Sequence, residues 1–343
     1  MRSSPVTNSE TNKAPLLEVV DLHTHFNTPQ GVAAAVDGVS FTLERGRMIG
    51  IVGESGSGKS VLSRTIIDIL PHDDSVSYGG QVLLEGRNLR ALPEREMRAI
   101  RGRDIAMVFQ DPMTSLNPVM KIGKQICEVL ILRCGVEKKV AREQAAALLE
   151  SVGIPDPLQQ LDRFPMHLSG GMRQRVAIAI ALAGDPRLLI ADEPTTALDV
   201  SIQAQILNLL RKLQKERDMA VMIISHNLGI ISEYADDVAV MYAGQIVERC
   251  ETRKLLDIPR MPYTQALLHS APSVTAPRGT RLKAIPGLPP SVLNFPNGCR
   301  FHERCSYRKP NCEQDMPPLK VSGEGSDHLC ACWYPLERLE ETA

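Results

Sequence analysis

Short apolar runs separated by turn residues mark out most of the chain. Residues 16–26 (LLEVVDLHTHF) and 36–46 (VDGVSFTLERG) alternate apolar and polar side chains, which predicts short antiparallel strands. Residues 48–53 (MIGIVG) are continuously apolar and end in glycine, a pattern typical of a buried parallel strand. Two further apolar runs, at 188–192 and 221–225, predict two more buried strands.

Helical periodicity occupies much of the sequence between these runs. We expect a helix from Lys59 to about Leu70, and mostly helical structure from about Met120 to Leu182. The clearest amphipathic series is 140–153 (VAREQAAALLESVG). Strands that alternate with helices predict an α/β core built on a parallel sheet.

After about Leu268 the regular pattern is lost. The stretches 270–273, 285–291 and 294–298 are dense in proline and glycine, which predicts an irregular extension that needs some staple to hold its shape. We therefore divide the chain into a flexible lead-in (1–15), a core domain (16–265, with a helical subdomain at about 118–182) and an extension (266–343).

The composition narrows the possible partners. A formal net charge of -1 argues against nucleic acid, because duplex binding relies on a basic surplus. An aromatic content of 4% with one tryptophan, Trp333, fits poorly with a base-stacking surface. The sequence contains neither an apolar stretch long enough to span a bilayer nor an N-terminal signal peptide. We expect a cytoplasmic protein that reaches a membrane only through partners.

A phosphate-binding loop is the first clear chemical motif. It follows a predicted buried strand and opens a predicted helix, which is the context that the pattern G-x-x-x-x-G-K-[ST] requires. Backbone N–H groups of such a loop curl around phosphates, the lysine reaches the β- and γ-phosphates, and the last hydroxyl ligates Mg²⁺. The matching residues are Gly53, Glu54, Ser55, Gly56, Ser57, Gly58, Lys59 and Ser60.

Polar residues at the ends of other predicted strands complete a site for ATP and Mg²⁺. Asp192 closes an apolar strand, where its carboxylate can hold Mg²⁺, and Glu193 is placed to polarise the attacking water as a general base. Gln110 follows another apolar run and could sense Mg²⁺ or the γ-phosphate. His226 ends the strand at 221–225, so its imidazole could contact the γ-phosphate.

A second anion-binding motif precedes the predicted helix at 176–184 (VAIAIALAG). Ser169, Gly170 and Gly171, within the segment LSGGMRQR, would present a hydroxyl and backbone N–H groups at a helix N-terminus. A chain that already has one phosphate loop would use a second one on the nucleotide of a partner.

These motifs resemble those of the ABC ATPases in both order and spacing, over about residues 16–265. The resemblance implies two ATPase domains that pair head to tail and hold each ATP between one phosphate loop and the opposite LSGG signature. It also implies that Phe26 stacks on adenine and that Asp199, in the loop Ala197–Asp199, organises the dimer interface. Two positions depart from the family pattern: Met172 replaces the usual glutamine, and Asn227 replaces the common aspartate.

The extension resembles the C-terminal region of dipeptide and oligopeptide permease ATPases, although Met261 stands where that pattern usually has histidine. The stretches that carry the resemblance are 261–272 (MPYTQALLHSAP), 285–291 (IPGLPPS) and 297–305 (NGCRFHERC). It implies a peptide importer with two membrane-spanning permease subunits, an extracytoplasmic peptide-binding protein and a second, related ATPase. The chain would then lie peripherally on the cytoplasmic face of the inner membrane.

Five of the eight cysteines gather in the extension, and in a reducing cytosol such a cluster favours a metal site over disulfides. Four thiolates suit structural zinc or an iron–sulfur cluster, and the spacing is wider than the short pairs usual for zinc. The resemblance to permease ATPases implies a [4Fe–4S] cluster. Its fourth ligand is expected to be Cys332, and Cys330 is the alternative. Free thiols that bind no metal are the third possibility besides zinc and the cluster. The expected ligands are Cys299, Cys305, Cys312 and Cys332.

Two other functions remain open at this stage. An importer of nickel or another small solute would share parts of this tail. A soluble, non-transport ABC ATPase would tend to carry two cassettes or a long coiled coil, and the sequence has a single phosphate loop and no sustained heptad pattern.

Overall fold

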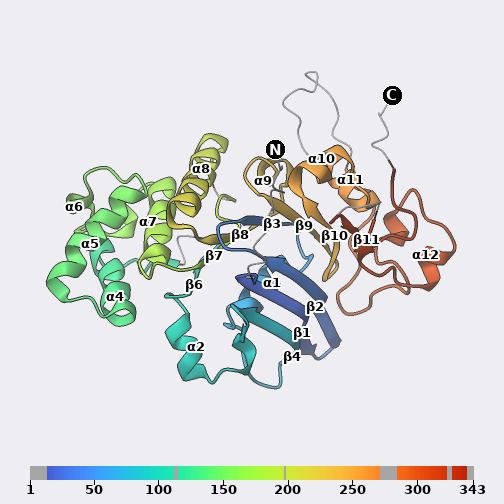
Figure 1. Cartoon of the computed structure of the whole chain (residues 1–343), viewed down its shortest axis with the longest axis horizontal. Helices are drawn as coiled ribbons and strands as arrows, with labels where there is room; N and C mark the ends of the chain where they lie inside the picture. Colours follow the sequence, from blue (N-terminus) through green and yellow to red (C-terminus); the bar gives the residue numbers. More distant parts are fainter. Residues whose placement is uncertain (1–13, 112–114, 197, 271–283, 323–326, 338–343) are drawn as a thin grey trace, which may run out of the picture.

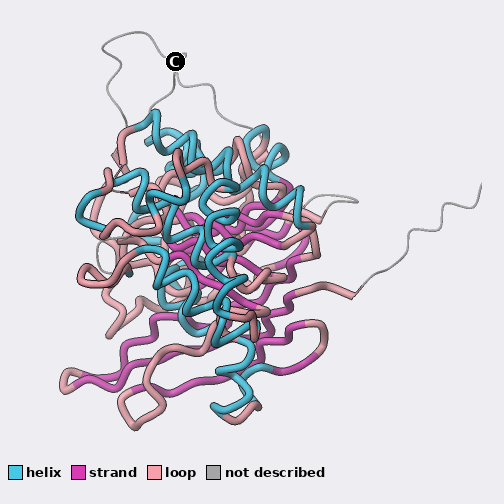
Figure 2. The backbone as a smooth tube through the Cα atoms, turned by 90° about the vertical axis from the view of Figure 1, so that its left-hand side faces the viewer, coloured by secondary structure: helices cyan, strands magenta, loops and turns pink. Residues whose placement is uncertain are grey.

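A computed structural model describes residues 14–111, 115–196, 198–270, 284–322 and 327–337. They form an antiparallel sheet, a larger mixed sheet, a group of helices at one end and a loop-rich extension at the other (Figure 1). Seen from the side, the antiparallel sheet lies below the mixed sheet and most helices lie above it (Figure 2). The predicted fold class is confirmed.

The antiparallel sheet grows from the alternating segments at the start of the chain. Its strand order is β2-β1-β4-β5, and β1 is paired with β2 from Leu17 opposite Leu43 to Thr28 opposite Gly31. Along the first half of β1 the side chains that face the core are fully buried, as the alternation predicts. The strands are β1 (Leu17–Thr28), β2 (Gly31–Leu43), β4 (Val76–Leu84) and β5 (Arg87–Asn88).

The mixed sheet has the order β11-β12-β10-β9-β3-β8-β7-β6, and its strands from β9 to β6 run parallel. Its strands are β3 (Met48–Val52), β6 (Ile105–Val108), β7 (Leu188–Asp192), β8 (Ala220–Ser225), β9 (Asp237–Tyr242), β10 (Gln245–Glu251), β11 (Lys320–Val321) and β12 (Leu329–Cys330).

The central strands read as continuous apolar runs because both of their faces are covered. In β7, Leu188 and Ile190 pack into the core shared with the antiparallel sheet, while Leu189 and Ala191 pack into the core shared with the helices. β8 alternates between the same two cores. A strand that is buried on both faces has no polar side to show in the sequence.

The helices cover the mixed sheet and extend beyond it. α4, α5 and α7 pack together at the left of Figure 1, inside the predicted helical subdomain. α1 ends at Ile66, four residues before the expected end, because Asp68 adopts the left-handed conformation (φ 58°). The helices are α1 (Lys59–Ile66), α2 (Glu94–Ile100), α4 (Ile122–Cys134), α5 (Lys138–Ser151), α6 (Pro157–Gln160), α7 (Gly170–Leu182), α8 (Val200–Arg217), α9 (Leu228–Ile231), α10 (Thr252–Asp257), α11 (Pro262–Ser270) and α12 (Asn311–Gln314). Within the described residues, none of them has the length and apolar character needed to cross a bilayer.

The extension is irregular but joins both sheets. Its two short strands continue the mixed sheet, with β12 antiparallel to β10 and β11 antiparallel to β12. Elsewhere the N–H of Ala34, on the outer strand β2, donates to the carbonyl of Val292 (3.1 Å). α11 runs through the expected boundary at 265/266, so the division of domains stays a prediction. Residues 1–13 of the expected lead-in lie outside the described residues.

Candidate functional site

The phosphate loop lies where the sequence places it, between the buried strand β3 and the first turn of α1. Two of its glycines are sterically required. A Cβ on Gly53 would lie 2.1 Å from the carbonyl oxygen of Met241, and a Cβ on Gly58, which has φ +102°, would lie 2.1 Å from that of Ala35. Ser55 and Gly56 form the exposed crest of the loop, and Ser57 is buried beneath it.

Lys59 is held inside the loop that it closes. Its Nζ donates to the carbonyl oxygens of Gly53 and Glu54, both at 2.8 Å, and to Ser57 Oγ at 3.3 Å. Burial lowers the pKa of Lys59, while the carboxylates of Glu193, Asp192 and Glu54 oppose that shift. The ammonium group therefore lies among the backbone groups that would surround a phosphate.

Ser60, in the first turn of α1, contacts Asp192, the last residue of β7. Ser60 Oγ donates to Asp192 Oδ1 at 2.9 Å, although the two residues are 132 positions apart. Asp192 is buried, and burial raises the pKa of its carboxyl group, with the hydrogen bond from Ser60 opposing the shift. This hydroxyl–carboxylate pair next to a phosphate loop is the ligand set that Mg²⁺ prefers.

Glu193 brings the three predicted catalytic side chains together. Its Oε2 accepts from Gln110 Nε2 at 2.9 Å and from Thr196 Oγ1 at 2.7 Å, and lies 3.5 Å from His226 Nδ1. Its φ of 46° is rare for a residue with a side chain, and its own N–H is fixed by the carbonyl of Ile224 (3.0 Å). Thr196 is a contact that the sequence analysis did not predict.

The LSGG signature lies at the start of α7, within the helical group and apart from α1 in the centre (Figure 1). Ser169 is the N-cap residue, and its Oγ accepts from the N–H of Met172 at 3.3 Å. Ser169 and Gly170 are exposed. A Cβ on Gly171 would lie 3.0 Å from Ile202 Cγ2, so this glycine also permits close packing on α8.

The two remaining nucleotide candidates lie on different elements. Phe26 is a half-buried residue near the end of β1, opposite Ala33. Asp199 is exposed and precedes the first turn of α8, where its carbonyl accepts from two backbone N–H groups. Ala197, the first residue of that predicted loop, lies outside the described residues.

Four cysteines of the extension face one small internal pocket. Aromatic rings form much of its remaining wall, including Phe301, Tyr307 and Trp333. Cys330 does not line this pocket; it is buried in β12, opposite Glu248. The cysteines that line it are Cys299, Cys305, Cys312 and Cys332.

Burial favours the protonated form of three of these thiols. It raises the pKa of Cys299 to about 11 and that of Cys332 to about 12, and it also raises the pKa of Cys305. Neighbouring cysteines contribute to each shift, because one thiolate disfavours the next. A cation in the pocket would reverse this effect by stabilising the thiolates.

The extension also contacts the phosphate loop directly, which the sequence analysis missed. Arg304 Nη1 and Nη2 donate to the two carboxylate oxygens of Glu54 at 2.6 and 2.9 Å, and Arg304 Nε donates to the carbonyl of Pro286 at 2.8 Å. The N–H of Glu54 donates to the hydroxyl oxygen of Tyr263 at 2.9 Å. The one signal in the sequence was an arginine between two cysteines, whose charge needs a partner when it is buried.

Comparison with known proteins identifies the family. A model of the ABC transporter family matches residues 36–196, and a model of the oligopeptide/dipeptide transporter C-terminal region matches residues 247–312. The oligopeptide transport ATP-binding protein OppD of Bacillus subtilis (strain 168) is 52% identical over 93% of this chain and 88% of its own length. The chain belongs to this family of ABC transporter ATP-binding proteins.

Other relatives support the same family assignment. The dipeptide transport ATP-binding protein DppD of Escherichia coli (strain K12) is 45% identical over 94% of this ABC subunit and 97% of its own length. Among solved structures, the dimeric ATP-binding cassette MJ0796 bound to ADP and Pi has a TM-score of 0.61 and 26% identity. It matches 69% of this chain and 99% of its own. That match corresponds in extent to the ATPase core without the extension.

Proposed function

We propose that this chain binds and hydrolyses ATP as the ATPase subunit of an ABC importer that takes up dipeptides or oligopeptides. The observation that carries the proposal is the convergence of Gln110, Glu193 and His226 beside the Ser60–Asp192 pair. The extension, similar to that of OppD and DppD, supports peptides as the substrate.

In the proposed mechanism the phosphate loop holds ATP. Backbone N–H groups of residues 53–58 would surround the phosphates, and Lys59 would exchange its carbonyl contacts for phosphate oxygens. Ser60, Asp192 and Gln110 would hold Mg²⁺, which neutralises the charge that develops on the phosphates.

Glu193 would take the proton of the attacking water at Oε2. Thr196 and Gln110 already donate to that oxygen, so both side chains can orient the carboxylate. His226, whose side chain is 54% exposed, would reach the γ-phosphate from the end of β8. Positioning a general base of this kind is worth about 10²–10⁴ in rate.

A complete ATP site would need a second ATPase subunit. Ser169, Gly170 and Gly171 would close the phosphate loop of the partner, and the exposure of Ser169 and Gly170 at the start of a 13-residue helix supports that role. Asp199 would organise the interface, and Phe26 would stack on adenine. We propose a related second ATPase as the partner.

The membrane-spanning permease subunits would dock beside the helical group. An apolar groove of ≈ 330 Å³ lies there, between the end of β6 and the helices α4 and α7. Its wall includes Phe109, Leu116, Val129 and Ala177, and Phe109 is 39% exposed. Ser115 and Leu116, in the segment that leads into α4, also line this groove; residues 112–114 lie outside the described residues. In this arrangement the chain lies at the cytoplasmic face of the inner membrane, and a peptide-binding protein works on the other side.

We also propose that the four pocket cysteines hold a [4Fe–4S] cluster. The donor set fits, since four thiols line one enclosed pocket with aromatic walls. Within the described residues, no three cysteine sulfurs lie within 4.8 Å of one another. The thiolates of one tetrahedral zinc ion would be about 3.8 Å apart, closer together than any three of these sulfurs. The cluster would cross-link the extension and hold its irregular segments in place.

The proposed transport role is tested by trapping the complex. A tagged Glu193→Gln chain should bind ATP, lose at least about 99% of its turnover, and co-purify from native membranes with two membrane subunits, a second ATPase and a peptide-binding protein. Glu216→Gln, on an exposed part of α8, is the matched control and should retain full turnover. Undiminished hydrolysis in Glu193→Gln would remove Glu193 as the base. Recovery with ribosomes or DNA-repair proteins would contradict the transport role.

The cluster is tested by metal analysis of anaerobically purified protein. We expect about four irons and four sulfides per chain, a large loss of both in Cys332→Ser, and retention in Cys330→Ser. One equivalent of zinc without colour would overturn the proposal, and equal loss in both variants would contradict the assignment of the fourth ligand.

A further inference from the structure

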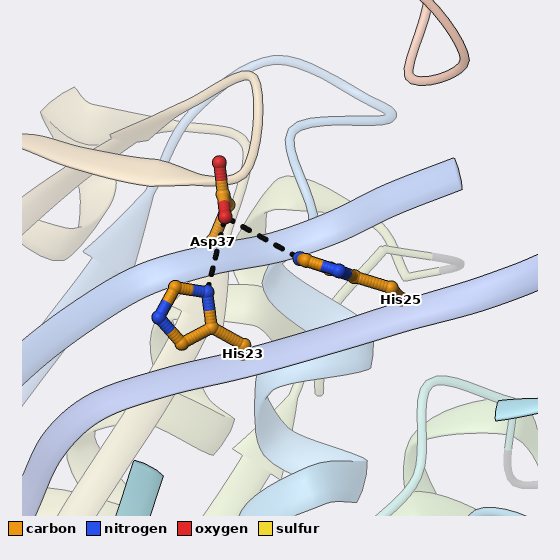
Figure 3. A group of neighbouring side chains, drawn as sticks. All are labelled: His23, His25 and Asp37. Carbon is orange, nitrogen blue, oxygen red and sulfur yellow. Dashed lines mark hydrogen bonds and ion pairs between the residues drawn. The ribbon is translucent and has the colours of Figure 1, made fainter. Parts of the chain in front are cut away.

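Two histidines and an aspartate meet on the antiparallel sheet, outside the ATP site. His23 and His25 are two positions apart on β1, so they share one face of the sheet, and Asp37 lies opposite His23 on β2. Both imidazole rings are directed at the carboxylate of Asp37 (Figure 3). His23 Nδ1 lies 3.0 Å from Asp37 Oδ1, and His25 Nε2 lies 3.3 Å from the same oxygen.

Proton counting shows that these contacts need an added positive charge. His23 Nε2 also lies 3.1 Å from Asp21 Oδ1, so both of its nitrogens face carboxylate oxygens. A neutral imidazole carries one N–H and can donate to one of them; the other nitrogen then directs a lone pair at a carboxylate. One extra proton on His23, or a cation between the rings and Asp37, would remove this repulsion.

We propose that His23, His25 and Asp37 form a binding site for a divalent transition-metal cation, best matched by zinc. The donor atoms His23 Nδ1, His25 Nε2 and Asp37 Oδ1 all lie within 4.8 Å of one another. Zinc–nitrogen and zinc–oxygen bonds of about 2.0–2.2 Å place tetrahedral ligands about 3.3–3.6 Å apart. The distances from Asp37 Oδ1 to His23 Nδ1 and His25 Nε2, 3.0 and 3.3 Å, are close to this, so small side-chain rotations complete the geometry.

The surroundings of the three ligands are those of a built metal site. A proton on His23 Nε2, hydrogen-bonded to Asp21 Oδ1, would leave Nδ1 free to ligate. Arg300, from the extension, donates to Asp37 Oδ2 and leaves Oδ1 facing the rings. The side chains of His23 and His25 are 31% and 29% exposed, so solvent can supply the fourth ligand.

The charge balance also accommodates a dication. Asp21, Asp37 and Arg300 together carry a net charge of -1 beside neutral imidazoles. Zinc would bring this to +1, and a single proton on His23 would bring it to 0.

The test uses the full chain, purified anaerobically so that the pocket cysteines hold the proposed cluster. Co²⁺ is the spectroscopic probe. We expect one Co²⁺ with visible ligand-field bands and without a thiolate charge-transfer band, because its ligands are nitrogen and oxygen. Zn²⁺ should displace it. His25→Ala should weaken the binding at least about tenfold, and so should Asp21→Asn, which retains all three ligands and changes only the partner of His23.

His72→Ala is the matched control, because His72 is an exposed histidine next to Asp68 on a different part of the chain. It should leave Co²⁺ affinity unchanged. Equal affinity in the wild type, His25→Ala and Asp21→Asn would overturn the proposal. A thiolate charge-transfer band that survives in His25→Ala would overturn it too, since the metal would then sit on cysteine.

Discussion

The contact between the extension and the phosphate loop predicts that Arg304 controls ATP affinity. We consider Arg304→Met, which keeps the length of the side chain and removes its charge. The variant loses both hydrogen bonds to Glu54 and leaves that carboxylate without its partner beside the phosphate site. The side chain of Arg304 is 4% exposed and that of Glu54 is 26% exposed.

Removing one partner of a buried ion pair costs about 3–5 kcal/mol, and the partial exposure of Glu54 reduces this to about 2–3 kcal/mol. We expect the phosphate loop to bear much of this cost, because the carbonyl of Glu54 holds Lys59 and its N–H bonds to Tyr263. The Kd for ATP should therefore rise at least about tenfold, which corresponds to 1.4 kcal/mol.

The assay is equilibrium titration with a fluorescent ATP analogue, together with circular dichroism and iron content. Arg308→Met is the matched control: Arg308 belongs to the same extension, is 55% exposed and lies 3.8 Å from Glu313. It should bind ATP normally. In a Glu54→Gln background the effect of Arg304→Met should shrink, because the uncompensated charge is gone. A folded Arg304→Met chain with wild-type iron content and a Kd within twofold of wild type would refute the reasoning.

Two further predictions concern stability. Tyr263→Phe removes the hydroxyl that accepts from the Glu54 N–H, so calorimetric melting should show a loss of about 1–3 kcal/mol; an unchanged melting temperature would contradict this. Burial alone would raise the pKa of Asp236, but Arg211 and the N–H of Met48 outweigh it and lower the pKa. Its contribution is present above the ordinary pKa and is lost as the pH falls through the folded value. In denaturant titrations, Asp236→Asn should therefore have a lower free energy of unfolding than wild type at pH 7, and this difference should shrink below about pH 4. A difference that stays constant with pH would contradict the stabilising role of the Asp236 carboxylate.

Much of the ATPase core could be predicted because its signals are local. The apolar runs of β3, β7 and β8 and the glycine pattern of the phosphate loop lie in short, contiguous segments. Gln110 and His226, which converge on Glu193, follow the ends of β6 and β8, and parallel strands bring their ends to one edge of the sheet.

Several of the contacts that were missed join distant segments. Arg304 and Glu54 are 250 positions apart, and no periodicity links them. The alternation in LHTHF places His23 and His25 on one face, but Asp37 joins them only through a hairpin register with bulges. The strands β11 and β12 have two residues each, too few to show a pattern. Such features depend on tertiary packing, which a single sequence leaves unspecified.

The hydrogen bond from Ala34 to Val292 has a consequence for solubility. β2 is the outermost of the long strands in its sheet, and an open strand of 13 residues is a template for pairing with another chain. The extension occupies part of that edge, and β12 and β11 occupy the edge of β10 in the other sheet. A chain cut after the ATPase core would therefore expose two sheet edges at once and would aggregate through them, even with its nucleotide residues intact.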